Sequence, residues 1–333
     1  MYWYYKYPLL IICLLILFGI GVVIYKKLPE NVTKTIQNAN PLGDDGDGAG
    51  TTEKNAQQDG SDEGGRSKSR TDEGWGEPRD LVDKQLLAAR DQLEAGKLLA
   101  ARALAQNVLA ASKVEMFDRR WRRAADILSQ VNTKLINSDI PCPEKVRYEI
   151  QSGDNLQSIA NKFNTRVAAI QRSNPMLNPN DPTIFPGTTL LIYEAEWRIE
   201  VYKENYVLLL MDGDKLFKLY PVAIGRQGRT PEGEFVIKNH LFHPDWTPPG
   251  RHIPYGDPEN VLGTHWLGLR PTGETDSALS GYGIHGTWEP DSIGSAASLG
   301  CVRMRNEDVA EVFDLVPNKT NVVIKGDEHV NSP

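Results

Sequence analysis

The sequence predicts a multidomain protein in which an N-terminal transmembrane helix precedes a small α-helical segment, a βααβ module and a mostly-β domain. An uncharged apolar run near the amino terminus is long enough to cross a bilayer as a helix. Further along the chain, the spacing of apolar residues changes from three or four, typical of helices, to alternation, typical of strands. The length of 333 residues also exceeds the size at which one hydrophobic core usually stops growing.

The apolar run covers residues 8–25 and contains no charged side chain. Aromatic residues precede it, and Lys26 and Lys27 follow it, as expected for anchors at the two membrane interfaces. A cleaved signal peptide would need a site of small residues after the run, and residues 22–27 offer none. We therefore expect an uncleaved transmembrane anchor within residues 1–28.

A flexible linker and a helical segment are predicted next. Residues 29–79 turn to Gly, Asp, Ser, Glu and Gln with few aliphatic side chains, which is typical of a disordered tether. Residues 80–140 carry apolar side chains at helical spacing, and Gly96 marks a break between the first two helices. The segment faintly resembles a tetratricopeptide hairpin, but a solenoid needs at least three repeats. A spacer or oligomerising element is favoured over a peptide-binding repeat, and its partner is unknown.

Residues 145–193 predict a strand, two helices and a second strand. The run Ser152-Gly153-Asp154-Asn155-Leu156, the later Asn174-Pro175 and the closing Pro186-Gly187 resemble the LysM module in order and spacing. This resemblance implies binding of the N-acetylglucosamine-containing glycan of the cell wall. Polar residues at the helix starts are expected to cap backbone amides rather than face a sugar.

Residues 196–326 predict a mostly antiparallel β domain with one helix near its end, and residues 327–333 form a tail. Asp212-Gly213 is expected to form a two-residue hairpin turn. Asn306 is expected to be the N-cap of the helix, since Glu307 and Asp308 follow in its first turn and apolar residues then recur on one face.

Two segments of this domain contain candidate catalytic residues. A cysteine becomes a nucleophile when a nearby base or positive charge favours its thiolate, and His285 and Arg303 provide both for Cys301. Gly286 and Gly300 leave backbone amides unshielded, as an oxyanion site requires. On composition alone, a single cysteine among small residues is more often a buried, inert side chain.

The pattern around these residues resembles the L,D-transpeptidase family, also called the YkuD family. Its signature is a His-Gly pair followed by Ser-x-Gly-Cys-Ile/Val-Arg, and here His285 precedes Cys301 by sixteen positions. The resemblance covers roughly residues 197–325 and includes residues 230–235 and 263–269. Leu299 stands where many family members carry histidine.

The resemblance implies a peptidoglycan transpeptidase without a cofactor. Cys301 attacks the bond between the third and fourth residues of a stem peptide, and His285 takes the thiol proton and returns one to the leaving D-alanine. A side-chain amine of a neighbouring stem then captures the thioester as a 3→3 crosslink, or water captures it in an L,D-carboxypeptidase side reaction. Arg303 orients the pair and favours the thiolate. Backbone amides near Gly300 and Cys301 hold the oxyanion, and Ser298 and Gly286 support this site. Carbapenems are expected to acylate the same sulfur.

These implications predict a protein that spans the bacterial inner membrane once, with its catalytic domain on the wall side. Its partners there are the stem peptides and glycan strands of peptidoglycan. The lysines after the apolar run favour the opposite orientation. The chain has 44 acidic and 37 basic residues and no long basic run, so the sequence does not predict nucleic-acid binding. The chain is expected to bind no metal, although His240, His243, Asp245 and His252 lie close together in sequence.

The spacing and order of the motif residues disfavour two other families of cysteine enzymes. A sortase has its histidine further upstream of the cysteine, and an NlpC/P60 hydrolase has the opposite order of the two residues. A Cys142–Cys301 disulfide would consume the nucleophile. Trp246, Trp266 and Trp288 are expected to fill a core more often than a substrate groove. The remaining candidate is a non-catalytic scaffold that binds peptidoglycan.

Overall fold

The computed structural model describes residues 78–178, 181 and 183–326. The predicted anchor of residues 1–28, nearly all of the predicted linker and the tail of residues 327–333 lie outside the described residues. Within the described part of the chain, no helix combines the length and the hydropathy needed to cross a membrane.

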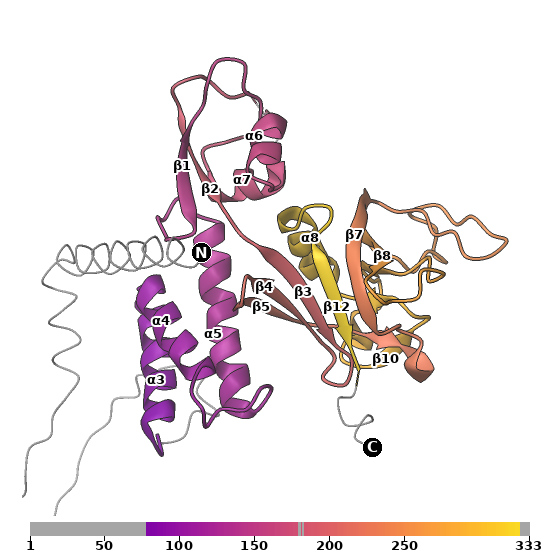
Figure 1. The fold of residues 1–333 in the computed structure, drawn as a ribbon, viewed down its shortest axis with the longest axis horizontal. Coiled ribbons are helices and arrows are strands. Elements are labelled where there is room, and N and C mark those ends of the chain that lie inside the picture. Colours follow the sequence, from indigo (N-terminus) through magenta and orange to yellow (C-terminus); the bar gives the residue numbers. More distant parts are fainter. Residues whose placement is uncertain (1–77, 179–180, 182, 327–333) are drawn as a thin grey trace, which may run out of the picture. The chain divides into compact units, whose positions relative to one another are not determined.

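The segment predicted to be helical forms a short antiparallel array. Asp80 and Asp118 lie one residue before the first and third helices, and each carboxylate accepts a hydrogen bond from a first-turn amide. Gly96 adopts a positive φ of 72° in the first turn between helices, which confirms the predicted break. The helices are α3 (Leu81–Glu94), α4 (Leu98–Leu109) and α5 (Arg119–Ile136) (Figure 1).

The predicted βααβ module is confirmed. The Asn155 side chain accepts from the Ser158 amide, and the Ser158 hydroxyl accepts from the Asn155 amide, so both close the start of the first helix. Its small core of aliphatic side chains is separate from the main core. The elements are β1 (Lys145–Glu149), α6 (Leu156–Lys162), α7 (Val167–Ser173) and β2 (Thr189–Tyr193), with β1 antiparallel to β2.

The C-terminal half forms a mixed sheet in the order β11-β9-β8-β7-β12-β3-β4-β5. Figure 1 labels the strands of this order from β8 to β5, and the accompanying helix α8. Most neighbours are antiparallel, as predicted, but β12 runs parallel to β3 and β11 runs parallel to β9. The strands are β3 (Trp197–Tyr202), β4 (Val207–Asp212), β5 (Lys215–Pro221), β7 (Gly233–Phe242), β8 (His265–Thr272), β9 (Gly283–His285), β11 (Val302–Arg303) and β12 (Asn321–Lys325), and the helix is α8 (Asn306–Leu315). A separate parallel pair joins β6 (Ile224–Gly225) to β10 (Ala296–Ser298).

The hairpin between β4 and β5 differs from its prediction by one residue. Asp212 pairs with Lys215, so Gly213 and Asp214 form the two-residue loop. Gly213 takes the positive φ of 55° that such a loop needs. The Asp212 carboxylate is used elsewhere, because it accepts from the Glu196 amide at 3.0 Å.

The helical array packs on this sheet rather than standing apart from it. The Asn132 side-chain amide donates to the carbonyl of Phe217 at 2.8 Å, and the Ser129 hydroxyl accepts from the Leu219 amide at 3.1 Å. Buried side chains of α3, α4 and α5 form one continuous hydrophobic cluster with those of the sheet. The helices therefore complete the core of the β domain.

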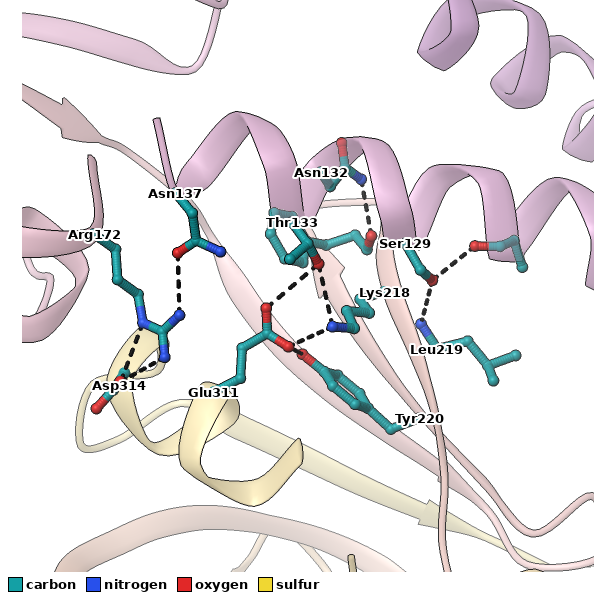
Figure 2. Close-up of polar contacts among 12 residues, drawn as sticks. Ser129, Asn132, Thr133, Asn137, Arg172, Lys218, Leu219, Tyr220, Glu311 and Asp314 are labelled. Carbon is teal, nitrogen blue, oxygen red and sulfur yellow. Dashed lines mark hydrogen bonds and ion pairs between the residues drawn. The ribbon is translucent and has the colours of Figure 1, made fainter. Parts of the chain in front are cut away.

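Helix α8 is tied to the other elements by the polar contacts that Figure 2 shows. The buried Glu311 carboxylate accepts from Lys218, from the Tyr220 hydroxyl at 3.1 Å and from the Thr133 hydroxyl at 3.4 Å. Further along the helix, Asp314 pairs with Arg172 of α7, with 2.7 Å between Oδ2 and Nη2. These contacts fix α8 against α5, β5 and α7.

Candidate functional site

Strand pairing brings the two predicted motif segments together. β9 ends at His285, β11 begins one residue after Cys301, and the two strands are parallel neighbours. In their register Val302 lies opposite Ile284, and Arg303 lies opposite His285. The predicted base therefore ends one strand and the predicted nucleophile directly precedes the neighbouring strand, although sixteen positions separate the two residues in the chain.

A tight turn presents the cysteine. The Ser298 hydroxyl donates to the carbonyl of Cys301 at 2.6 Å and accepts from the amide of Gly300 at 3.1 Å. Gly300 has φ of +150°, and a Cβ there would lie 3.0 Å from the Tyr282 ring. Glycine is required at this position both by its backbone angle and by the ring beside it.

The two glycine amides expected to be unshielded both have acceptors within the protein. The Gly300 amide donates to Ser298, and the Gly286 amide donates to the carbonyl of His265 at 3.1 Å. The first bond closes the turn around Cys301, and the second extends the backbone pairing of β9 with β8 by one residue. Since their hydrogens are already engaged, these two amides are not open donors to a substrate oxyanion.

The imidazole of His285 is buried, with 3% of the residue exposed. Its Nδ1 lies 2.6 Å from the carbonyl oxygen of Gly286. A carbonyl oxygen only accepts, so Nδ1 must carry the ring proton and Nε2 is left with a lone pair. Burial lowers the pKa of His285 to about 4. The backbone at Gly286 and at Leu262 opposes this change, and the charge of Arg303 adds to it.

The thiol of Cys301 is uncharged at neutral pH. Burial raises its pKa to about 11, although a backbone hydrogen bond at Gly283 and the charge of Arg303 act in the opposite direction. Its Sγ lies 3.7 Å from the carbonyl oxygen of Gly281, the geometry of a thiol donor. The residue is partly exposed, and the protein atoms packed around it disfavour the charged form of its thiol. The sequence favoured a thiolate because it does not show this surrounding protein.

Arg303 contacts neither reactive side chain by a hydrogen bond found in the structure. Its Nη1 donates to the Glu289 carboxylate at 2.7 Å and to the Ser292 hydroxyl at 3.1 Å. The arginine is buried while Glu289 is exposed. Arg303 therefore acts on Cys301 and His285 through its charge, and the sequence pattern gave no sign of Glu289 as its partner.

A groove of about 590 Å³ ends at the cysteine. Trp246 and Trp266 line it, which places two of the three noted tryptophans at the groove. Trp288 lies instead near Tyr255, with ring centroids 6.2 Å apart. Leu299 also lines the groove and is 68% exposed, so an apolar side chain stands at its mouth.

Sequence reasoning misassigned Asn306. The N-cap of α8 is Arg305, which makes no side-chain cap bond, and Asn306 is the first helical residue. The Asn306 side chain instead hydrogen-bonds the backbone at Thr264 and Thr287, next to the histidine. A polar residue before acidic ones is the usual sign of a cap, and only the fold reveals the other partners.

The histidines considered as metal ligands have protein partners instead. His252 pairs with Asp245 at 3.0 Å between Nε2 and Oδ2, and His240 contacts Asn318 and Val316. Among the residues that the structure describes, no three His, Cys, Asp or Glu side chains are grouped to hold a metal ion. Cys142 and Cys301 are both free thiols, so no disulfide consumes the predicted nucleophile.

Comparison with known proteins agrees with both resemblances. Residues 196–324 match the L,D-transpeptidase catalytic domain model called YkuD, and residues 148–192 match the LysM domain model. The chain is 37% identical over 184 residues to the YkuD protein of Bacillus licheniformis, covering 53% of this chain and 97% of that protein. It is 35% identical over 184 residues to YkuD of Bacillus subtilis, with the same coverage.

Among solved structures, an L,D-transpeptidase from Mycobacterium smegmatis is similar over 42% of this chain and 63% of that chain, with 20% identity and a TM-score of 0.30. The Bacillus relatives are matched over nearly their whole length. The chain therefore belongs to the L,D-transpeptidase family, with a LysM domain ahead of its catalytic domain.

Proposed function

We propose that this protein crosslinks peptidoglycan through a thioester on Cys301, with His285 as the acid and base. The observation that carries the proposal is the in-register pairing of β9 with β11 at the end of an apolar groove. This pairing brings the segment that carries the thiol of Cys301 beside the strand that carries the neutral imidazole of His285, with the buried guanidinium of Arg303 directly opposite that histidine. Family membership supplies the reaction class.

In the first half-reaction, Sγ of Cys301 attacks the carbonyl carbon that joins the third and fourth residues of a donor stem peptide. Nε2 of His285 takes the thiol proton as the carbon–sulfur bond forms. The carbon–nitrogen bond then breaks, and the imidazolium returns the proton to the amine of the departing D-alanine. The product is a thioester between the enzyme and the shortened stem.

In the second half-reaction, a side-chain amine of another stem attacks the thioester carbon. His285 accepts a proton from this amine, the carbon–sulfur bond breaks, and the sulfur of Cys301 regains a proton. The new amide is a 3→3 crosslink. When water attacks in place of the amine, the result is an L,D-carboxypeptidase side reaction.

In the proposed mechanism, Cys301 and His285 are both uncharged before substrate binds, and they become charged only during the reaction. Thiol and imidazole are both neutral at pH 7, since their pKa values are about 11 and about 4. The charge of Arg303 favours the thiolate and disfavours the imidazolium, so it assists attack and then the return of the proton to the leaving amine. We assign the oxyanion to the backbone amide of Cys301, because the amides of Gly300 and Gly286 are engaged.

The LysM domain supplies affinity for the glycan of the same polymer. Residues 148–192 are held beside α8 by the pair of Arg172 and Asp314, so glycan binding and catalysis occur in one body. We place the described domains on the wall side of the cell membrane, where their substrate lies. The apolar run of residues 8–25 remains the predicted anchor.

The direct test is a crosslinking assay with the full chain. Wild type and Cys301→Ala are incubated with a disaccharide tetrapeptide, and products are sequenced by tandem mass spectrometry. We expect a dimer with a 3→3 bond and free D-alanine from wild type alone. A folded wild-type protein that binds purified cell wall but forms neither dimer nor free D-alanine would support the non-catalytic scaffold.

A further inference from the structure

One asparagine side chain joins two loops beside the imidazole. Oδ1 of Asn306 accepts from the amides of Thr264 and Thr287, each at 3.1 Å. Its Nδ2 donates to the carbonyl of Thr287 at 2.8 Å. Three backbone groups from two separate segments are thus satisfied by a single side-chain amide.

One of these contacts acts on the peptide unit that His285 uses. The amide of Thr287 and the carbonyl of Gly286 belong to the same peptide group, and in a trans peptide they point in opposite directions. Oδ1 of Asn306 accepts from the Thr287 amide at 3.1 Å, and Nδ1 of His285 lies 2.6 Å from the Gly286 carbonyl oxygen. The orientation of this peptide therefore decides whether Nδ1 keeps an acceptor.

The local glycines make room for this contact. A Cβ at Gly286 would lie 2.1 Å from Oδ1 of Asn306, and a Cβ at Gly263 would lie 2.3 Å from the same atom. Any larger residue at either position displaces the asparagine. The glycine that follows the histidine in the motif thus has a steric reason, separate from any contact with substrate.

The asparagine itself is held on a rigid element. It is the first residue of α8, whose Val309 and Val312 are fully buried in the core. Further along the same helix, Glu311 bonds to Lys218, Tyr220 and Thr133, as Figure 2 shows. The side-chain amide of Asn306 is therefore a fixed reference point for the loop after β9.

We propose that Asn306 is a positioning residue for the reaction: it fixes the Gly286–Thr287 peptide so that Nδ1 of His285 stays protonated and Nε2 stays free to take the Cys301 proton. This inference rests on the role of His285 in the proposed function. It predicts a spectroscopic property of the resting protein as well as an effect on rate.

The test uses the full chain and compares wild type with Asn306→Ala, Asn306→Asp and the control Asn132→Ala, and a fifth protein, His285→Gln, serves for assignment. Asn132 is another buried asparagine that bonds a backbone carbonyl, but its partner is Phe217 in β5. The substitution Asn306→Asp keeps an acceptor for the Thr287 amide and loses the donor to the Thr287 carbonyl. The tautomer of His285 is read from imidazole ¹⁵N shifts, assigned by the signals missing in His285→Gln.

We expect the Nδ1-protonated tautomer in wild type and in N132A. In N306A the tautomer signal should become mixed, and the rate of acylation of Cys301 by imipenem should fall about 100-fold, the scale of a lost general base. N306D should keep the tautomer and recover part of the rate. Circular dichroism checks the fold of each variant.

Two results would overturn the proposal. An Nε2-protonated tautomer in wild type would do so without any variant, and so would a folded N306A with the wild-type tautomer and acylation rate. If wild type is not acylated at all, the proposed function fails. The ¹⁵N spectra still decide the role of Asn306 in that case.

Discussion

Arg303 of β11 lies directly opposite His285 of β9 in the parallel pair that carries the site. The positive charge lowers the pKa of His285 and also acts to lower that of Cys301. Burial lowers the first and raises the second, and it is the largest influence on both groups. The resting pair is consequently a thiol and a neutral imidazole rather than a preformed ion pair.

This charge state predicts how the free thiol reacts. Because the pKa of Cys301 is raised to about 11, thiolate is scarce at pH 7 and increases steadily as the pH rises toward that value. Alkylation of Cys301 by iodoacetamide should therefore be slow at pH 7 and accelerate by about tenfold per pH unit up to about pH 10. Mass spectrometry of the peptide that contains Cys301 separates it from Cys142. A rate that is already level between pH 6 and pH 9 would mean that an ion pair exists at rest.

The network on α8 predicts a stability effect far from the cysteine. Glu311→Ala leaves the partly buried Lys218 and the fully buried Tyr220 without their carboxylate partner. Removing one partner of such a pair typically costs about 3–5 kcal/mol. We expect a loss of this size in the free energy of unfolding in urea. Glu307→Ala, an exposed site on the same helix, should change it by less than about 1 kcal/mol, and equal effects of the two substitutions would contradict the role of the network.

The shared core predicts that the helices and the catalytic domain unfold together. Leu128 of α5 is fully buried in the cluster that also contains the sheet. Leu128→Ala should cost about 2–5 kcal/mol, as buried leucine truncations do. Tryptophan fluorescence and imipenem acylation of Cys301, followed across the same urea series, should shift to lower urea by the same amount. Acylation that persists after the helices unfold would show that α3 to α5 are an independent spacer.

Much of the architecture is readable from the sequence because it depends on local signals. The βααβ order follows from apolar periodicity, and the break at Gly96 follows from a residue that tolerates positive φ. The positions of Cys301 and His285 follow from a motif of fixed spacing, and strand pairing then joins them. Each of these features lies within a short stretch of chain.

The features that sequence reasoning missed are long-range contacts. Asn306 resembles a helix cap in sequence, and only its distance to Thr287 in the fold shows its other use. The Gly286 amide is consumed by His265 on the neighbouring strand, which the motif does not reveal. The loss of solvation at Cys301, which raises the pKa that the sequence suggested would be lowered, likewise depends on segments distant in the chain. The burial and the hydrogen-bond partners of these residues are set by tertiary contacts, which a local sequence pattern does not show.

The central claim is that Cys301 forms an acyl-enzyme, and one measurement tests it most directly. The full chain is incubated with imipenem at pH 7, and the intact mass is recorded for wild type, Cys301→Ala and Cys142→Ala. We predict an adduct of one imipenem on wild type and on C142A, located by peptide mapping to Cys301, and none on C301A. Folded wild-type protein without an adduct, or an adduct that C301A retains, would contradict the account.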